Sequence, residues 1–391
     1  MKKNFLILTS PFKIFNFITL GVIFFYLFLF FYNVAKPETN KEEINVKTTD
    51  LVSDLKTISF NELEANGFSK KDFYVMGFNE NNEFLLARDK VKDPQLINEG
   101  KPRIIATINT NNLNIQKYFV SIASIEQYLN LNNNDILVLG NSGNFAGIFN
   151  IKTGNLKTII KNEKGKKGFR FTDFILKDEN KIYVEGYFFD ENQIAEDGNN
   201  YWVEFNPNKT GLSALGKKVT NTTEIVKKLG QVRMFYWATP NMAIFTRLNA
   251  NLNPTELWAY YNSKLYKIDT QEFIIEIALS KNGDALYLYK KGDLSYFSIY
   301  NLKTKNKIEI AAPKGRPFLY PFISNDGNIA IVSYLNILNK KMDFMIGFKD
   351  QNYKLNDLVI QAKMGSFKLS SDGSKFSILN DDGLIIGNIK K

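Results

Sequence analysis

The stretch Leu279-Ser280-Lys281-Asn282-Gly283-Asp284-Ala285-Leu286-Tyr287 joins two apolar segments through a polar turn that contains Asn-Gly. The same pattern recurs at residues 323–331 and 369–377, where the turn contains Asp-Gly. Such turns connect antiparallel strands because Asn, Asp and Gly tolerate the positive φ of a tight hairpin. The copies are spaced by about 45 residues, which is the period of a propeller blade. This part of the chain is therefore predicted to be all-β and built from blades.

Extending this period toward the N-terminus predicts seven blades of four strands each, with a short helix at residues 222–229 between the third and fourth blades. The seventh unit holds only three strands before the sequence ends, and an open ring would expose unpaired backbone. We therefore predict that residues 51–60 supply the missing strand and close the ring. The alternative is a six-bladed ring with an N-terminal addition. The hairpin turns between the first and second strands are expected near Asn82, Asn134, Asn180, Asn241, Gly283, Gly327 and Gly373.

The Ser-x-Asn/Asp-Gly turns resemble the propeller repeats of TolB-like periplasmic proteins and their WD-repeat-like relatives. The resemblance covers about the last 120 residues best. Two features depart from it: the residue before Asp-Gly is not proline, and no Trp-Asp dipeptide is present. The resemblance implies a β-propeller fold. It does not imply a particular partner, because this fold carries many functions.

Residues 15–34 form an apolar stretch without a charged side chain, long enough to cross a bilayer as one helix. Lysines precede it and charges of both signs follow it, so the positive-inside rule places the N-terminus in the cytoplasm. We expect a short cytoplasmic N-terminus (1–14), a transmembrane helix (15–34), a flexible linker (35–50) and an extracytoplasmic propeller (51–391) in the periplasm or at the cell surface. A cleaved signal peptide is the alternative, and it would deliver the propeller to the same side.

The composition excludes several kinds of chemistry. The chain has no cysteine and no histidine, which removes thiolate nucleophiles, Cys/His metal sites and Ser-His-Asp triads. Neither a nucleophile elbow nor a phosphate-binding loop is present. The net charge of +10 comes from lysines spread over the whole chain, which argues against a nucleic-acid surface. We therefore expect no enzyme activity, no cofactor, no metal and no nucleic-acid partner.

Carboxylates could still hydrolyse glycosides without histidine if two of them faced the centre of the ring. Five acidic residues lie on or beside predicted strands, and some of them are candidates for that position. An exposed or ion-paired role for these side chains is the alternative that we favour. The five residues are Asp173, Glu185, Glu204, Glu256 and Glu276.

The arginines are few, and the predicted strands place them all on one side of the ring. They fall at loops between second and third strands, or at connections that enter a first strand, and these two kinds of loop emerge on the same face of a propeller. Arginine grips carboxylates and phosphates better than lysine because its planar guanidinium donates two parallel hydrogen bonds. The predicted partner-binding residues are Arg88, Arg103, Arg170, Arg233, Arg247 and Arg316.

These observations predict a membrane-anchored, outward-facing propeller that serves as a protein-binding or scaffold module of the cell envelope. Its partner is expected to be another envelope protein with an acidic surface. The alternative is a small-ligand or carbohydrate receptor, or a hydrolase, that uses the central channel. A third reading is a propeller that faces the cytoplasm.

Overall fold

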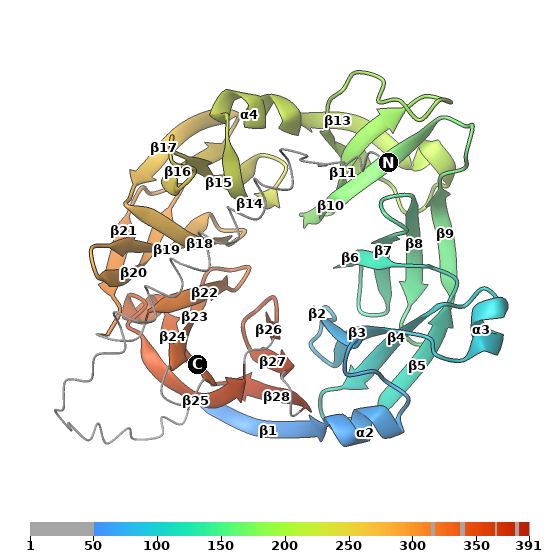
Figure 1. Cartoon of the computed structure of the whole chain (residues 1–391), viewed down its shortest axis with the longest axis horizontal. Helices are drawn as coiled ribbons and strands as arrows, with labels where there is room; N and C mark the ends of the chain where they lie inside the picture. Colours follow the sequence, from blue (N-terminus) through green and yellow to red (C-terminus); the bar gives the residue numbers. More distant parts are fainter. Residues whose placement is uncertain (1–50, 314–316, 337–340, 364–365, 380–382, 391) are drawn as a thin grey trace, which may run out of the picture. The chain divides into compact units, whose positions relative to one another are not determined.

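Seven four-stranded sheets are arranged as blades around a central axis in the computed structural model (Figure 1). The structure describes residues 51–313, 317–336, 341–363, 366–379 and 383–390. In each blade the first strand lies nearest the axis and the fourth lies at the outside. The seven-bladed prediction is therefore confirmed, and the six-bladed alternative is wrong.

The first six blades use four consecutive strands each. Blade 1 contains β2 (Tyr74–Phe78), β3 (Phe84–Lys90), β4 (Arg103–Asn109) and β5 (Ile115–Val120). Blade 2 contains β6 (Ile125–Asn130), β7 (Asp135–Gly140), β8 (Phe145–Asn150) and β9 (Leu156–Lys161). Blade 3 contains β10 (Gly168–Asp178), β11 (Lys181–Phe189), β12 (Tyr201–Phe205) and β13 (Leu215–Asn221). Blade 4 contains β14 (Val232–Thr239), β15 (Met242–Leu248), β16 (Pro254–Tyr261) and β17 (Lys264–Thr270).

The last three blades complete the ring. Blade 5 contains β18 (Phe273–Leu279), β19 (Asp284–Lys291), β20 (Leu294–Asn301) and β21 (Lys307–Ala311). Blade 6 contains β22 (Phe318–Ile323), β23 (Ile329–Asn336), β24 (Lys341–Phe348) and β25 (Asn356–Lys363). Blade 7 contains β26 (Ser366–Leu369), β27 (Lys375–Leu379), β28 (Gly383–Ile389) and, as its outermost strand, β1 (Val52–Ser59).

The seam of the ring lies inside blade 7, where β1 pairs with β28 in antiparallel orientation. The pairing runs from Val52 opposite Ile389 to Ser59 opposite Gly383, with a bulge between Ser53 and Lys56. The strand predicted from residues 51–60 therefore occupies the expected place. It ends at Ser59 because the side chain of that residue caps a helix that begins at Phe60.

The repeated Ser-x-Asn/Asp-Gly turns share one hydrogen-bond pattern. In each turn a buried serine hydroxyl accepts a backbone N–H from the start of the second strand. Asp284 N donates to Ser280 Oγ at 3.0 Å, Ile329 N donates to Ser324 Oγ at 3.0 Å, and Lys375 N donates to Ser370 Oγ at 2.9 Å. The serine thus satisfies a backbone donor that the tight turn would leave unpaired.

Contacts between neighbouring blades show that these turns lie on one face of the ring. Lys281 N donates to Asn325 O at 2.9 Å, and Asn325 N donates to Ser371 O at 2.9 Å. Asn82 Nδ2 of blade 1 donates to Asp372 Oδ1 of blade 7 at 3.0 Å. We call this side the turn face. The opposite side, where second strands lead into third strands and each blade leads into the next, is called the rim face.

Each blade packs between two neighbouring blades, so both faces of its sheet are buried. Apolar side chains from these faces fill the spaces between the blades. Strand β7, for example, is buried almost from end to end. Between blades 3 and 4 the rings of Trp202 and Trp237 meet edge to face, with centroids 5.7 Å apart. Edge-to-face contact of this kind is favourable beyond the area that it buries.

The helices are short and lie in connections: α2 (Phe60–Ala65), α3 (Pro94–Asn98), α4 (Thr222–Leu229), η1 (Gly211–Ala214) and η2 (Lys349–Gln351). The helix predicted at 222–229 is confirmed as α4. Within the residues that the structure describes, no helix is long and apolar enough to span a bilayer. The expected cytoplasmic segment (1–14), transmembrane helix (15–34) and linker (35–50) lie outside the described residues.

Candidate functional site

Five of the predicted binding arginines lie at the ends of strands that open onto the rim face. Arg88 is near the end of β3, and Arg103 is the first residue of β4. Arg170 and Arg233 are close to the starts of β10 and β14, and Arg247 is close to the end of β15. Since all blades share one direction around the ring, these positions fall on the same side. The sixth arginine, Arg316, lies outside the described residues.

A cluster of positive charge surrounds Tyr74 at the junction of blades 7 and 1. The Arg88 guanidinium lies over the Tyr74 ring at 4.9 Å from its centroid, and Lys368 Nζ lies 5.1 Å from the same centroid. Lys368 Nζ also donates to Tyr74 Oη at 3.1 Å. Burial lowers the pKa of the Arg88 guanidinium, and the charge of Arg103 lowers it further. An anion bound here would therefore be favoured by several cations.

Two further contacts hold charged groups on the rim face of blades 1 and 2. Arg103 Nε donates to the carbonyl of Ala123 in the connection to blade 2, at 2.5 Å. Glu126 Oε1 accepts a hydrogen bond from Ser142 N at 3.1 Å. Arg170 Nε and Glu126 Oε2 are buried and have no hydrogen-bond partner among the described residues. The rim of blades 1 to 3 thus holds polar groups whose hydrogen-bonding capacity is incompletely used.

The arginines of blade 4 differ in how available they are. Arg233 is exposed, with its guanidinium 5.8 Å from the centroid of the Phe273 ring. Arg247 Nη1 instead forms an ion pair with Glu256 Oε2 at 3.2 Å. Among the described side chains, no carboxylate lies within ion-pair distance of Arg88, Arg103, Arg170 or Arg233. These four can therefore engage a partner more readily than Arg247.

Exposed aromatic and aliphatic side chains accompany the arginines, and they were not predicted from the sequence. Tyr236, for instance, exposes 45% of its surface, although protein atoms around it raise the pKa of its hydroxyl through desolvation. Apart from Leu55 and Leu212, the large hydrophobic residues that are most exposed in the described part lie in rim-face connections, at strand ends beside them, or on innermost strands. They are Tyr74, Ile97, Phe119, Ile194, Val226, Phe235, Tyr236, Leu252, Leu294 and Tyr320.

Side chains from blades that are not neighbours meet across the axis on the turn face. Lys281 Nζ of blade 5 donates to the carbonyl of Lys177 in blade 3 at 2.7 Å. Lys177 Nζ in turn donates to Glu80 Oε1 of blade 1 and to Leu131 O of blade 2, both at 3.1 Å. We call these groups the lysine brace. The brace links blades 1, 2, 3 and 5 on the turn face.

Among the carboxylates considered for glycoside hydrolysis, those whose side chains the structure describes do not gather at the axis. Glu204 and Glu256 lie on the third strands β12 and β16 and pair with Lys181 at 2.8 Å and Arg247 at 3.2 Å. Of the described acidic side chains in that group, Glu276 alone lies on an innermost strand. Burial raises the pKa of Glu276, and the charge of Arg233 offsets part of this effect. No cluster of acidic residues suited to a metal ion occurs among the described residues.

Comparisons with solved structures agree with this geometry. An oligogalacturonate lyase from Vibrio parahaemolyticus superposes with a TM-score of 0.54 and 9% identity, over 82% of this chain and 90% of that one. An oligogalacturonate lyase in complex with manganese superposes with a TM-score of 0.56 and 8% identity, over 82% of this chain and 89% of that one. An uncharacterized protein from Listeria monocytogenes EGD-e superposes with a TM-score of 0.52 and 12% identity, over 83% of this chain and 92% of that one. The chain has a β-propeller fold.

At these identities the likeness of the propeller to other proteins extends to the fold alone. The resemblance to propeller repeats is confirmed at that level. No family model matches the sequence, and no curated protein matches it.

Proposed function

We propose that the propeller is a protein-docking module whose rim face receives a partner with an acidic surface. One observation carries the proposal: arginines without a described carboxylate partner share this face with exposed apolar side chains such as those of Phe119, Ile194 and Leu252. Tyrosine and arginine are enriched where proteins bind each other, since they combine apolar area with directional hydrogen bonds. The positive charge would select an acidic partner and speed the encounter.

The proposed setting is the cell envelope. The apolar stretch 15–34 would anchor the chain in a membrane, with the N-terminus in the cytoplasm and the propeller outside. A relation to TolB-like periplasmic proteins would fit this setting. In this proposal the partner is another envelope protein, and the chain needs neither a cofactor nor a catalytic residue.

A second candidate, a receptor or hydrolase that uses the centre of the ring, is favoured by tyrosines on innermost strands. Tyr74, Tyr236 and Tyr320 are exposed there, and aromatic rings next to polar groups suit small polar ligands such as sugars. Such a ligand would enter from the rim face, because the lysine brace links turns of four blades on the opposite face.

Crosslinking in intact cells, followed by affinity capture of the tagged full-length chain and mass spectrometry, tests the docking proposal. The test variant carries Arg88→Ser, Arg170→Ser and Arg233→Ser. The matched control carries Lys152→Ser, Lys209→Ser and Lys303→Ser, which removes the same charge from exposed loops of the turn face.

We expect one envelope protein to be captured by the wild type and by the lysine variant but to be lost from the arginine variant. Equal capture by the arginine variant would contradict docking on the rim face. Capture of nothing but the chain itself would favour the small-ligand alternative.

A further inference from the structure

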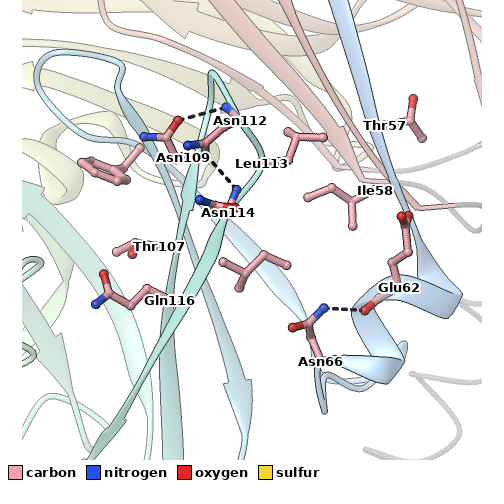
Figure 2. Close-up of a pocket in the computed structure, with 12 residues that line it drawn as sticks. Thr57, Ile58, Glu62, Asn66, Thr107, Asn109, Asn112, Leu113, Asn114 and Gln116 are labelled. Atoms are coloured by element: carbon pink, nitrogen blue, oxygen red, sulfur yellow. Dashed lines mark hydrogen bonds between the residues drawn. The ribbon is translucent and has the colours of Figure 1, made fainter.

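A second concave site lies at the outer edge of the ring, where β1 and α2 approach the β4–β5 hairpin of blade 1. The cavity has a volume of about 750 Å³. Figure 2 shows Thr57, Ile58, Glu62 and Asn66 on one side, and the turn from Asn109 to Asn114 with Gln116 on the other. Sites for small molecules commonly have volumes of about 300 to 1,000 Å³. The cavity is thus large enough for a ligand, and it lies apart from the arginines of the rim face.

Hydrogen bonds between the two walls fix the cavity in shape. Lys56 Nζ, on β1, donates to the carbonyl oxygens of Thr110 and Asn111 at 3.1 and 2.6 Å. Lys117 Nζ, on β5, donates in the opposite direction to the carbonyl of Asn66. Both ammonium groups bind backbone atoms of the facing wall. The two walls are therefore held at a set distance before any ligand arrives, which lowers the entropy lost on binding.

The lining is almost free of charge, although 23% of the residues in the chain are charged. Among the described residues that line the cavity, only Glu62 has a charge. Its carboxylate already accepts hydrogen bonds from Ser59 N at 2.7 Å and from Ser59 Oγ at 2.8 Å. These two bonds lower the pKa of Glu62, with the bond from the backbone N–H as the larger cause. Glu62 Oε2 thus caps α2, and the other groups that line the cavity are neutral.

The neutral groups are mainly amides and hydroxyls, which both donate and accept hydrogen bonds. Asn109 Oδ1 accepts the backbone N–H of Asn111 at 2.9 Å, and Asn112 Oδ1 accepts that of Asn114 at 3.0 Å. These bonds hold the turn and leave the amide N–H groups of Asn109 and Asn112 as donors. The side chains of Asn114 and Thr57 are exposed and take part in no hydrogen bond within the described chain.

An apolar surface completes the cavity. Leu113 has a left-handed backbone, with φ of +61°, at a position where the same turn of blade 2 has Gly154. A side chain in this conformation is strained, and strain of this kind persists where the surroundings require it. Leu113 packs against the apolar cluster that contains Ile58. The strained residue thus presents an apolar surface between the two polar walls.

We propose that this cavity binds a neutral oligosaccharide. A planar amide can bond two adjacent hydroxyl groups of a sugar, and the C–H face of a sugar ring can pack on Leu113 and Ile58. The lack of available charge would disfavour acidic sugars and phosphorylated ligands, because their desolvation would go uncompensated. An extended peptide is the competing occupant, and the test distinguishes it.

The test applies the purified full-length chain, in mild detergent, to an array of neutral and acidic glycans. Titration calorimetry with the neutral glycan that binds best then measures Kd for the wild type and three variants. Thr57→Val and Asn114→Leu each remove a polar group from one wall. Asn155→Leu is the matched control, since Asn150 N donates to Asn155 O in the turn of blade 2 as Asn109 N does to Asn114 O, both at 2.9 Å.

We expect binding to a neutral glycan, weakened tenfold or more by Thr57→Val and by Asn114→Leu and unchanged by Asn155→Leu. Binding to acidic glycans alone, or to no glycan, would overturn the proposal, as would equal weakening by Asn155→Leu. A peptide occupant would appear as density in a crystal structure of the purified chain and would also overturn it. This result does not depend on docking at the rim face, because no arginine lines the cavity.

Discussion

Gly327 holds a place at the contact between blades 5 and 6 that no other residue fits. Its φ is +71°, and a Cβ atom there would lie 2.1 Å from Asp284 Oδ2. That carboxylate is buried and pairs with Lys349 Nζ of blade 6 at 2.9 Å, while Asn301 Nδ2 donates to its other oxygen at 2.7 Å. A small residue with a left-handed backbone therefore lets a buried carboxylate pair with an exposed lysine of the next blade.

Gly327→Ala should destabilise the protein by about 2–3 kcal/mol, because it adds backbone strain and displaces a buried, paired carboxylate. Urea denaturation of the wild type and the variant measures the change. Gly211→Ala is the control: its φ is +61°, but a Cβ atom there meets nothing within 4 Å. Backbone strain alone should cost about 1 kcal/mol at that position. Equal losses for the two variants would show that the contact with Asp284 has no influence.

At the scale of the strand, a recurrent irregularity decides which side chains face the centre of the ring. In blades 1 to 6 the pairing between the first two strands shifts register within the innermost strand, by one residue between Ile274 and Glu276 and between Val232 and Met234, for example. A bulge adds one residue and reverses the alternation of side chains beyond it. Phe235 and Tyr236, which directly follow one of these shifts, are both exposed.

This irregularity explains what the sequence could and could not predict. Turn residues and apolar alternation were enough to predict the seven blades. The strand at 51–60, which belonged to no other blade, was enough to predict how the ring closes. The exposed aromatic residues were missed because a period of two does not reveal a bulge. The partners of Arg103 and Arg233, the Ala123 carbonyl and the Phe273 ring, belong to the next unit along the ring and could not be read from local sequence. In blade 3 the fourth strand was predicted at 211–215, but residues 211–214 form the short helix η1, and the strand runs from 215 to 221.

The contact between blades 7 and 1 should be sensitive to acid through Asp372. Burial would raise the pKa of Asp372, but hydrogen bonds from Ser374 N, Ser370 Oγ, Ser374 Oγ and Asn82 bring it below its usual value. A lowered pKa means that the stabilisation is present above the unfolded value of about 3.9 and is lost as the pH falls through the folded value. Asp372→Asn should therefore reduce stability at pH 7 and flatten its dependence between about pH 5 and pH 2. Urea denaturation at several pH values checks this, and an unchanged slope would contradict it.

At the scale of the whole molecule, closure of the ring depends on a strand from the opposite end of the propeller. Without β1 the edge of β28 would be unpaired, and the apolar cluster that contains Ile58 and Leu384 would be open to water. A fragment of residues 51–391 should therefore unfold cooperatively, whereas residues 60–391 should aggregate or lose at least about 3 kcal/mol of stability. Circular dichroism and light scattering compare the two. Equal thermal stability would show that the strand is dispensable.

The net charge of +10 belongs to the whole molecule and should act at long range. If the rim face docks an acidic partner, raising the salt concentration from about 0.05 M to about 0.5 M should slow association about tenfold, because screening shortens the range of the attraction. Dissociation should change less, since apolar contacts are not screened. Surface plasmon resonance with the captured partner measures both rates. An association rate that is independent of salt would assign docking to the apolar residues.

Pairing at the seam must also wait until nearly the whole chain has been synthesised. Asp54 and Asn388, which are joined by a hydrogen bond across the seam at 2.8 Å, lie 334 residues apart in the chain. At about 5 to 20 residues per second, a ribosome takes about 15 to 70 s to travel between them. During that interval blades 1 to 6 can form in order, while β1 has left the ribosome and has no partner. The strand of the propeller that is synthesised first is therefore among the last to pair. Until β28 has been made, a chaperone can bind the unpaired β1.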